Sequence, residues 1–328
     1  MLEITIACQN SDRTRPLLDG RVRLRNCDAR VLGIDPEEIF HRAFRHREFD
    51  VAELSLSTHA LLVARGDSPY VGIPVFPSRA FRHSALYMRK GAALTGPKDL
   101  NGCRVGVPDF QQTAGVWVRG ILADCHGVDC DSIVWVQGGQ EQPGRKTRVA
   151  FELRGKRQVE VAPADSTLNR LLAEGKIDAI CSPRAPKPVD GADDYHTRVF
   201  PDFRTEEEAY FRSTGIFPIM HIVGIRRELH ESQPWLAVEV FNAFEEARRL
   251  CMEELRMVNF LRSSLPWLAD DVRRVVEVMG PDFWTYGLDA NRAQLDTFLR
   301  YALADGLLGT PLSATDLFAA NVVEPFRV

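Results

Sequence analysis

The chain has 328 residues, 45% of them hydrophobic and 26% charged, and 41 basic against 45 acidic residues give a formal net charge of -4. This length predicts a globular protein of about two domains, because single cores stop growing near about 250–300 residues. The slight acidity and the lack of a dense Lys/Arg run argue against a nucleic-acid partner, and no apolar run reaches the length of a membrane span.

Strand and helix patterns alternate along the chain from the first residue. Asp35 and Ser57 are the expected N-caps of the first two helices. Alternating Arg21, Arg23 and Arg25 indicate the outer face of a strand. The βαβ alternation predicts an α/β fold with parallel sheets flanked by helices. In chain order we expect strand 2–8, helix 36–46, strand 50–56, helix 57–65, strands 70–76, 84–88 and 104–107, helix 112–125, strand 133–137, loop 140–158, strand 159–162, helix 166–174, strands 177–181 and 215–226, and helices 235–255, 266–279, 281–286 and 292–305.

Two apolar runs, 70–88 and 215–226, bracket the βαβ unit at 96–200. A two-lobed protein whose chain crosses twice between its lobes has this arrangement. We therefore expect a discontinuous first lobe from 1–85 plus 222–328, and a second lobe from 86–221. Because open α/β sheets bind ligands outside the carboxyl ends of their strands, the ligand is expected in a cleft between the lobes.

The segment 74–87 at the first crossing combines three kinds of side chain that act on ligands. Arg79 and Arg82 are candidate anchors, since guanidinium groups bind carboxylates in forked geometry. His83 is the leading candidate for moving a proton near neutral pH. The alternatives are structural ion pairs for the arginines and a hydrogen-bonded core position for the histidine.

Two further residues are candidates for proton transfer. His221 lies in the second crossing, where it could meet His83, and Glu53 lies near the carboxyl end of an expected strand. Their alternatives are a satisfied core histidine and an ion pair with an arginine. The three residues could instead form a two-His, one-carboxylate metal site. Because their spacing does not indicate one, no metal is expected.

The remaining candidates would bind substrate. Arg13 follows the first strand, and Ser55 lies beside Glu53. Helix N-termini offer free N–H groups to anions, which makes Gln112 and Thr113 candidates. Solvated charge, helix capping and core packing are the alternatives. Arg184, at the end of another expected strand, is a comparable anchor for an anion. Phe81 and Phe217 are candidate contacts for a planar ring of the substrate.

Seven cysteines, an odd number without a Cys-x-x-Cys pair, argue against a disulfide framework or zinc ribbon. The first residues start directly in a strand pattern, without the features of a secretory signal. These two observations predict a cytoplasmic protein. No glycine-rich loop supports nucleotide binding. The amphipathic helices at 235–305 either bury an interface in a homo-oligomer or cover the first lobe.

Two motifs resemble those of type II periplasmic-binding-protein folds, one at 99–108 and one at 172–180. Longer segments resemble the 4,5-dihydroxyphthalate decarboxylase family, and they lie at 36–40, 49–57, 75–83, 214–221, 282–287 and 291–292. The resemblance implies a cytoplasmic enzyme of aromatic catabolism that converts 4,5-dihydroxyphthalate, a small aromatic dicarboxylate, to protocatechuate and CO2. Such a reaction requires no cofactor in principle, so none is expected.

Two other functions remain open at this point. One is a solute-binding protein for an aromatic acid, against which the missing secretory signal argues. The other is a lyase of the same fold that acts on a related carboxylated ring.

Overall fold

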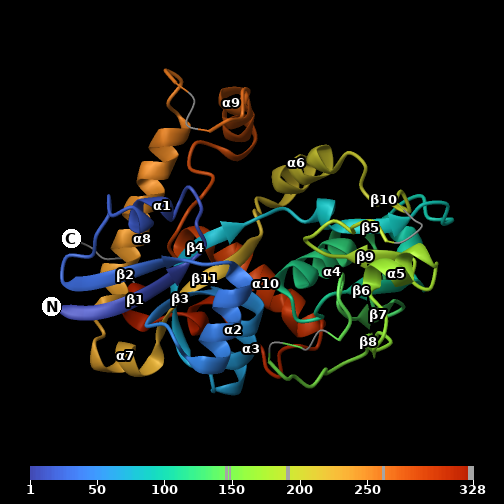
Figure 1. Ribbon diagram of the computed structural model, residues 1–328, viewed down its shortest axis with the longest axis horizontal. Coiled ribbons are helices and arrows are strands. Elements are labelled where there is room, and N and C mark those ends of the chain that lie inside the picture. The colour runs from blue at the N-terminus through green and yellow to red at the C-terminus, as the bar shows by residue number, and fades with distance from the viewer. Residues whose placement is uncertain (145–146, 148, 190–192, 261–262, 324–328) are drawn as a thin grey trace. The chain divides into compact units, whose positions relative to one another are not determined.

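The computed structural model describes residues 1–144, 147, 149–189, 193–260 and 263–323. The chain divides into two compact units. Unit 1 comprises Met1–Arg79, Ile219–Leu295 and Leu312–Val328, and unit 2 comprises Ala80–Pro218 and Asp296–Pro311 (Figure 1). The chain therefore passes from one unit to the other four times, whereas the sequence predicts two passages.

Unit 1 is built on a five-stranded sheet in the order β2-β1-β3-β11-β4. The strands β1, β2 and β3 are parallel, whereas β11 runs antiparallel between β3 and β4. The strands are β1 Leu2–Cys8, β2 Cys27–Gly33, β3 Val51–Ser55, β4 Tyr70–Arg79 and β11 Ile219–Arg226. The helices are α1 Arg15–Leu18, α2 Pro36–His46, α3 Leu56–Arg65, α7 Arg227–Ser232, α8 Leu236–Leu255, α9 Leu268–Met279 and the first turn of α10 Arg292–Ala304.

Unit 2 is built on a six-stranded sheet in the order β10-β5-β9-β6-β7-β8. The strands β9, β6, β7 and β8 are parallel, and β5 runs antiparallel to β9. The rest of α10 also belongs to this unit. The strands are β5 Leu86–Arg89, β6 Arg104–Val107, β7 Val134–Gln137, β8 Gln158–Val161, β9 Ala179–Cys181 and β10 His196–Arg198, and the helices are α4 Thr113–His126, α5 Leu168–Ala173 and α6 Phe203–Thr214.

Local chemistry explains why several expected elements form where they do. The Asp35 side chain accepts the backbone N–H of Glu37, and Pro36 occupies the first helical position, so α2 begins as predicted. All five residues of β3 are buried, as expected for a central strand covered on both faces. Because β1 and β3 are parallel neighbours, their carboxyl ends lie at the same edge of the sheet.

Other expectations are wrong for identifiable reasons. Residues 21–26 form no strand, because the backbone N–H groups of Arg25 and Asn26 donate to the carboxylate of Glu239 instead. The helix α3 begins at Leu56 with Ser55 as its N-cap, so Ser57 lies inside the helix. Residues 281–286 are not helical. The indole of Trp284 donates to the Phe76 carbonyl, which ties this stretch to β4.

The lobe boundaries also differ from those expected. The units divide after Arg79 and after Pro218, and residues 296–311 return to unit 2. In unit 2, the backbone N–H of Arg154 donates to the Gly306 carbonyl oxygen at 2.9 Å, and Asp305 pairs with buried Arg119 and partly buried Arg157. These contacts give the C-terminal segment a place in unit 2 that helix periodicity could not reveal.

His59 links α3 to the C-terminal part of unit 1 and predicts a pH dependence of stability. Its side chain is fully buried, and Nε2 lies 2.9 Å from the Leu317 carbonyl oxygen. Burial lowers the pKa of His59 from 6.5 to about 4. Between these pH values the unfolded chain binds a proton that the folded chain does not. Stability is therefore complete above about pH 6.5 and falls by about 3 kcal/mol as the pH drops to about 4.

Urea unfolding between pH 4 and pH 8 measures this effect. The variant His59→Gln is expected to be less stable at pH 8 but to show a shallower acid slope than the wild type. The exposed His41 provides the matched control, and His41→Gln should keep the wild-type slope. An unchanged slope in His59→Gln would contradict the assignment.

Candidate active site

A buried carboxylate and a partly exposed imidazole meet at the edge of the unit 1 sheet. The Glu53 side chain is completely buried, and the side chain of His221 is 17% exposed. Their Oε1 and Nδ1 atoms lie 2.5 Å apart. In the β3–β11 register His221 lies opposite Ser55, which places Glu53 diagonally across the same face. Because Nδ1 faces the carboxylate, Nε2 is the ring atom left to exchange a proton.

Both partners are held by their surroundings. The backbone N–H of Gln9, just after β1, donates to Oε2 of Glu53 at 2.8 Å. The ring of Phe40, on α2, meets the His221 ring edge-on at 4.8 Å. Ser55 is buried beside them at the end of β3. The carboxylate is therefore fixed by one strand end, and the imidazole is fixed by the carboxylate and an aromatic wall.

A cation lies at the same sheet edge. Arg13 donates from Nε to the Pro77 carbonyl oxygen at 3.1 Å, and the Gln9 side-chain amide donates to that oxygen at the same distance. The guanidinium of Arg13 lies 4.0 Å from the centre of the Trp284 ring, and it pairs with Asp12. A guanidinium stacked on an indole keeps its plane fixed, and this suits forked binding of a carboxylate.

Arg79 is bound by protein groups within unit 1. Its guanidinium donates to Gln294 Oε1 and to the Thr285 carbonyl, both at 2.7 Å, and to Asn291 Oδ1. Burial lowers its pKa to about 9, which still leaves it cationic at neutral pH. These contacts hold the segment before α10 against β4. Its role as a substrate anchor stays a prediction.

His83 belongs to unit 2, whereas Glu53 and His221 lie on strands of unit 1. It begins a short 3₁₀ turn, is only 3% exposed, and packs at 5.4 Å against the rings of Phe200 and Tyr210. Its Nδ1 is 4.0 Å from the carboxylate of Glu207. Burial lowers the pKa of His83 to about 4, so the ring is neutral at pH 7.

The two aromatic candidates, Phe81 and Phe217, contact each other in unit 2. Phe81 and Phe217 pack with ring centres 4.8 Å apart, both in unit 2 and both partly buried. Arg82 lies between Phe81 and His83 in the sequence, and burial lowers its pKa. Its role as a substrate anchor stays a prediction. The ring of Phe211, on α6, lies edge-on to that of Phe81 with ring centres 6.4 Å apart.

The other unit 2 candidates follow parallel strands of its sheet. Gln112 is the N-cap of α4 and makes no side-chain cap bond, while Thr113 is buried at the first helical position. Arg184 is exposed after β9, and its carbonyl oxygen accepts the side-chain amide of Gln140 at 2.9 Å. Their substrate contacts, like the cleft expected between the lobes, stay predictions.

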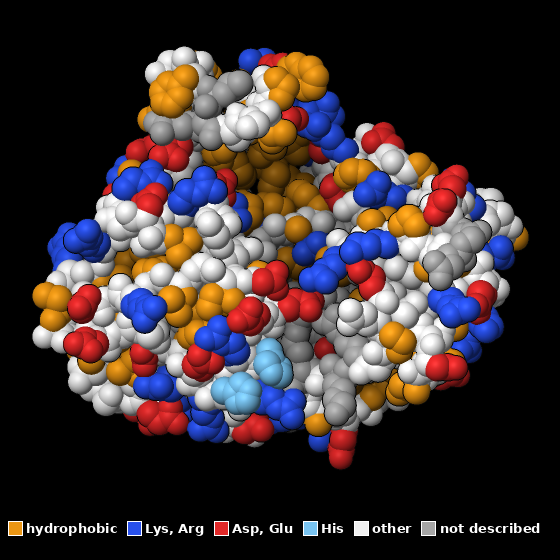
Figure 2. Space-filling view, viewed as in Figure 1, with side chains coloured by type: hydrophobic (Ala, Val, Ile, Leu, Met, Phe, Trp, Pro, Cys, Tyr) orange, Lys and Arg blue, Asp and Glu red, His pale blue; other side chains and the backbone are white. Residues whose placement is uncertain are grey.

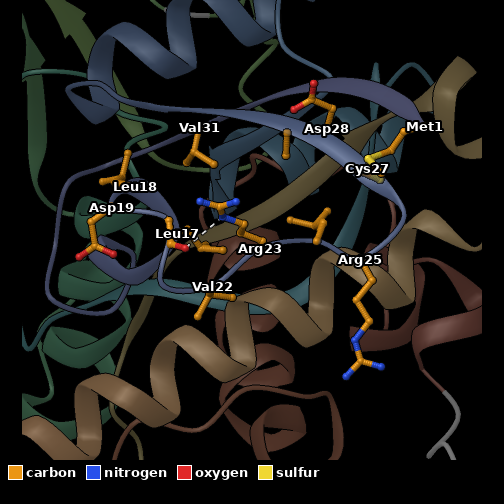
Figure 3. A pocket seen from close by; sticks show the side chains of 13 residues that line it. Met1, Leu17, Leu18, Asp19, Val22, Arg23, Arg25, Cys27, Asp28 and Val31 are labelled. Atoms are coloured by element: carbon orange, nitrogen blue, oxygen red, sulfur yellow. Dashed lines mark hydrogen bonds between the residues drawn. The ribbon is translucent and has the colours of Figure 1, made fainter.

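A cavity lined by other residues and the possibility of a metal-binding cluster were the two remaining features to compare with the candidate site residues. A cavity of about 540 Å³ lies beside β2, and none of the candidate site residues line it. Figure 3 shows its lining side chains, among them Arg23. Among the described residues, no group of three or more His, Cys, Asp or Glu side chains is placed to hold a metal ion.

Sequence reasoning missed two residues of this arrangement. Gln9 follows the carboxyl end of β1, and the strand-end rule that singled out Glu53 and Arg13 also applies to it. The Trp284 indole contacts Phe76 and Arg13, which both lie more than 200 residues away along the chain, and no local pattern connects it to them.

Two curated proteins are similar to this chain over long stretches. A 4,5-dihydroxyphthalate decarboxylase from Comamonas testosteroni is 39% identical over 327 residues, covering 100% of this chain and 99% of that protein. A 4,5-dihydroxyphthalate decarboxylase from Pseudomonas putida is 46% identical over 185 residues, which are 56% of this chain and 72% of that protein. The chain matches no protein-family model.

Solved structures share the fold at low sequence identity. The periplasmic sulfonate-binding protein SsuA from Methylobacillus flagellatus has a TM-score of 0.52 and 12% identity, over 98% of this chain and 93% of that chain. The aliphatic sulphonate binding protein SsuA from Escherichia coli gives the same score and identity, over 98% and 99%. The expected α/β fold of the type II periplasmic-binding-protein class is thus confirmed. In the part of the chain that the structure describes, no helix has the length and apolar character needed to cross a bilayer.

Proposed function

This chain belongs to the 4,5-dihydroxyphthalate decarboxylase family, and we propose from this premise that it converts 4,5-dihydroxyphthalate to protocatechuate and CO2. The observation that carries the proposal is the pairing of buried Glu53 with partly exposed His221. A carboxylate placed behind an imidazole suits a residue that moves a proton, because it orients the ring and balances the charge of the protonated form.

The chemistry requires one proton and an electron sink. The hydroxyl para to the leaving carboxylate lets the ring accept a proton at the carbon that bears this carboxylate. The phenol proton is lost as the ring becomes quinonoid. When the C–C bond breaks, its electron pair returns to the ring, CO2 leaves, and the phenol is protonated again. The added proton stays on carbon, so the reaction consumes one proton per CO2.

We assign the proton delivery to Nε2 of His221, with Glu53 as the positioning carboxylate. Arg13, stacked on Trp284, is the proposed anchor for the carboxylate that is retained. Electrostatic anchoring of this kind fixes the ring relative to the proton donor, which lowers the entropy cost of the transition state. Because burial lowers its pKa to about 4, His83 is rarely protonated near neutral pH and is the weaker candidate for delivering the proton.

The setting that we propose is the cytoplasm. All seven cysteines are free thiols, and a reducing compartment keeps them so. We further propose that the reaction proceeds without a metal. Chelator dialysis should leave the rate unchanged, and loss of activity with recovery on adding a divalent cation would contradict this part of the proposal.

The direct test is to incubate the purified chain with 4,5-dihydroxyphthalate and to quantify CO2 and protocatechuate. Equal amounts of the two products are expected. Phthalate, which lacks the para hydroxyl, is the matched control and should not react. Tight binding of 4,5-dihydroxyphthalate without turnover would support a solute-binding function instead. Turnover of a differently substituted carboxylated ring in its place would support the related-lyase function.

A further inference from the structure

An apolar surface lies at the C-terminal end of α8 and continues over α9. We call residues 256–260 and 263–279 the apolar arm. Of the nine large hydrophobic side chains that are exposed in the described part of the chain, five belong to it. They are Met257 (44% exposed), Val258 (80%), Phe260 (51%), Leu265 (59%) and Trp267 (73%). Such clustering is unusual, because exposed apolar residues of monomers are normally scattered.

The helix α9 extends this surface. Leu268, Val272, Val275, Val276 and Met279 recur at helical spacing and form one stripe. A stripe of this kind normally lies in a core, yet none of the twelve residues of α9, all of them described, is fully buried. In Figure 1 the end of α8 and α9 extend beyond the sheet of unit 1, and Figure 2 shows hydrophobic side chains at their tip.

We propose that the apolar arm is the interface through which two copies of this chain form a dimer. The exposed parts of the five side chains amount to on the order of 600 Å², already at the upper end of what monomers expose. The half-covered stripe of α9 adds to this area. A stable dimer buries about 800 Å² per partner, so the arm is large enough for one.

The charges of the arm favour a second copy over other partners. The polar face of α9 carries three acidic residues, Asp270, Asp271 and Glu277, against two arginines, Arg273 and Arg274. Arg273 pairs with Asp270 at 2.8 Å within the same helix. Membrane-surface helices instead carry a Lys/Arg-rich polar face. A nearly balanced surface can meet itself without like-charge repulsion, as a two-fold interface requires.

Sedimentation equilibrium of the full chain at concentrations from about 0.1 to 50 μM tests the proposal. The wild type should have the mass of two chains or of a multiple of two. The double variant Val258→Asp/Trp267→Glu should raise the dimer dissociation constant about 100-fold or more, because two central apolar contacts become charged. Circular dichroism should show an unchanged fold, since both side chains are exposed.

The matched control is Val161→Asp, which places the same charge at an 83% exposed valine outside the arm. It should keep the wild-type mass. If the double variant does not fold, Val258→Asp alone and Leu265→Glu alone serve in its place, each with a weaker dimer expected. A monomeric wild type throughout this range overturns the proposal. Arm variants that dimerise as tightly as the wild type overturn it as well.

Discussion

The variant Glu53→Gln is expected to lower the kcat for decarboxylation of 4,5-dihydroxyphthalate about 100-fold or more, with little change in KM. Glutamine keeps the shape of glutamate and can still accept the backbone N–H of Gln9, so the fold should be retained. It removes the negative charge that balances a protonated His221 ring. The loss should therefore fall on proton transfer and not on substrate binding.

The variant His221→Gln is expected to lose at least as much, because it removes the group that carries the proton. If the two residues act as one unit, the double variant should be no slower than the slower single variant. Steady-state kinetics of the three variants, with melting temperatures to check the fold, provides the measurement. The exposed His46→Gln is the matched control and should retain the wild-type rate.

A well-folded Glu53→Gln or His221→Gln enzyme with wild-type turnover would refute the role of the pair. This result would leave the proposed reaction intact, because product formation by the wild type tests the reaction separately. The proton donor would then have to be sought among other groups of the chain.

The sequence identifies Glu53 and His221 as candidates for proton transfer, but it does not predict that their side chains contact each other. Glu53 was found by its place near the carboxyl end of a strand, and His221 by its place in an apolar run that returns to the first lobe. Their contact depends on β11 inserting between β3 and β4 in a register that sets His221 opposite Ser55. Register is a property of the paired strands, and a single strand pattern does not contain it.

For His83, the sequence pattern does not predict the surroundings of the side chain. The sequence places it in a short segment rich in arginine and aromatic residues, which looks like a ligand-binding strand. In the structure β4 ends at Arg79, and His83 lies in a 3₁₀ turn among Phe200, Tyr210 and His126. Because these rings come from distant elements, neither the burial of His83 nor its lowered pKa could be predicted from its neighbours in sequence.

In the fold, too, local features could be predicted from the sequence and long-range features could not. Elements with strong local signals, such as β1 and α2, have the predicted bounds, since alternation and capping are local properties. The helix α10 was also predicted, but not its passage from unit 1 to unit 2 after Leu295. This passage depends on buried charges that lie far apart along the chain.

The charges in question form a network around Asp305 in unit 2. The Asp305 carboxylate accepts Arg119 Nε at 2.7 Å and Arg157 Nε at 3.2 Å, and the side chains of Arg119 and Asp305 are 0% and 2% exposed. Arg119 also donates to the Phe110 carbonyl oxygen and lies 3.9 Å from the centre of the Phe110 ring. The Asp305 carboxylate thus pairs with both guanidinium groups, and Arg157 pairs with Asp131 as well.

The variant Asp305→Asn is therefore expected to lower the free energy of unfolding by about 3–5 kcal/mol, because it leaves buried positive charge without compensation. Urea unfolding measures the loss. The matched control is Asp289→Asn, where the side chain is 70% exposed and pairs with Arg292, and about 0.5 kcal/mol or less is expected there.

A double variant separates the charge from the packing. Arg119→Met combined with Asp305→Leu removes both members of the pair, while Arg157 keeps Asp131 as its partner at 2.5 Å. We expect the double variant to be more stable than Asp305→Asn, since apolar side chains of similar volume replace a buried pair at low cost. If Asp305→Asn is as stable as Asp289→Asn, the network does not hold residues 296–311 in unit 2. The contacts of the α10 rings of Phe298 and Tyr301 with Trp117 would then have to do so.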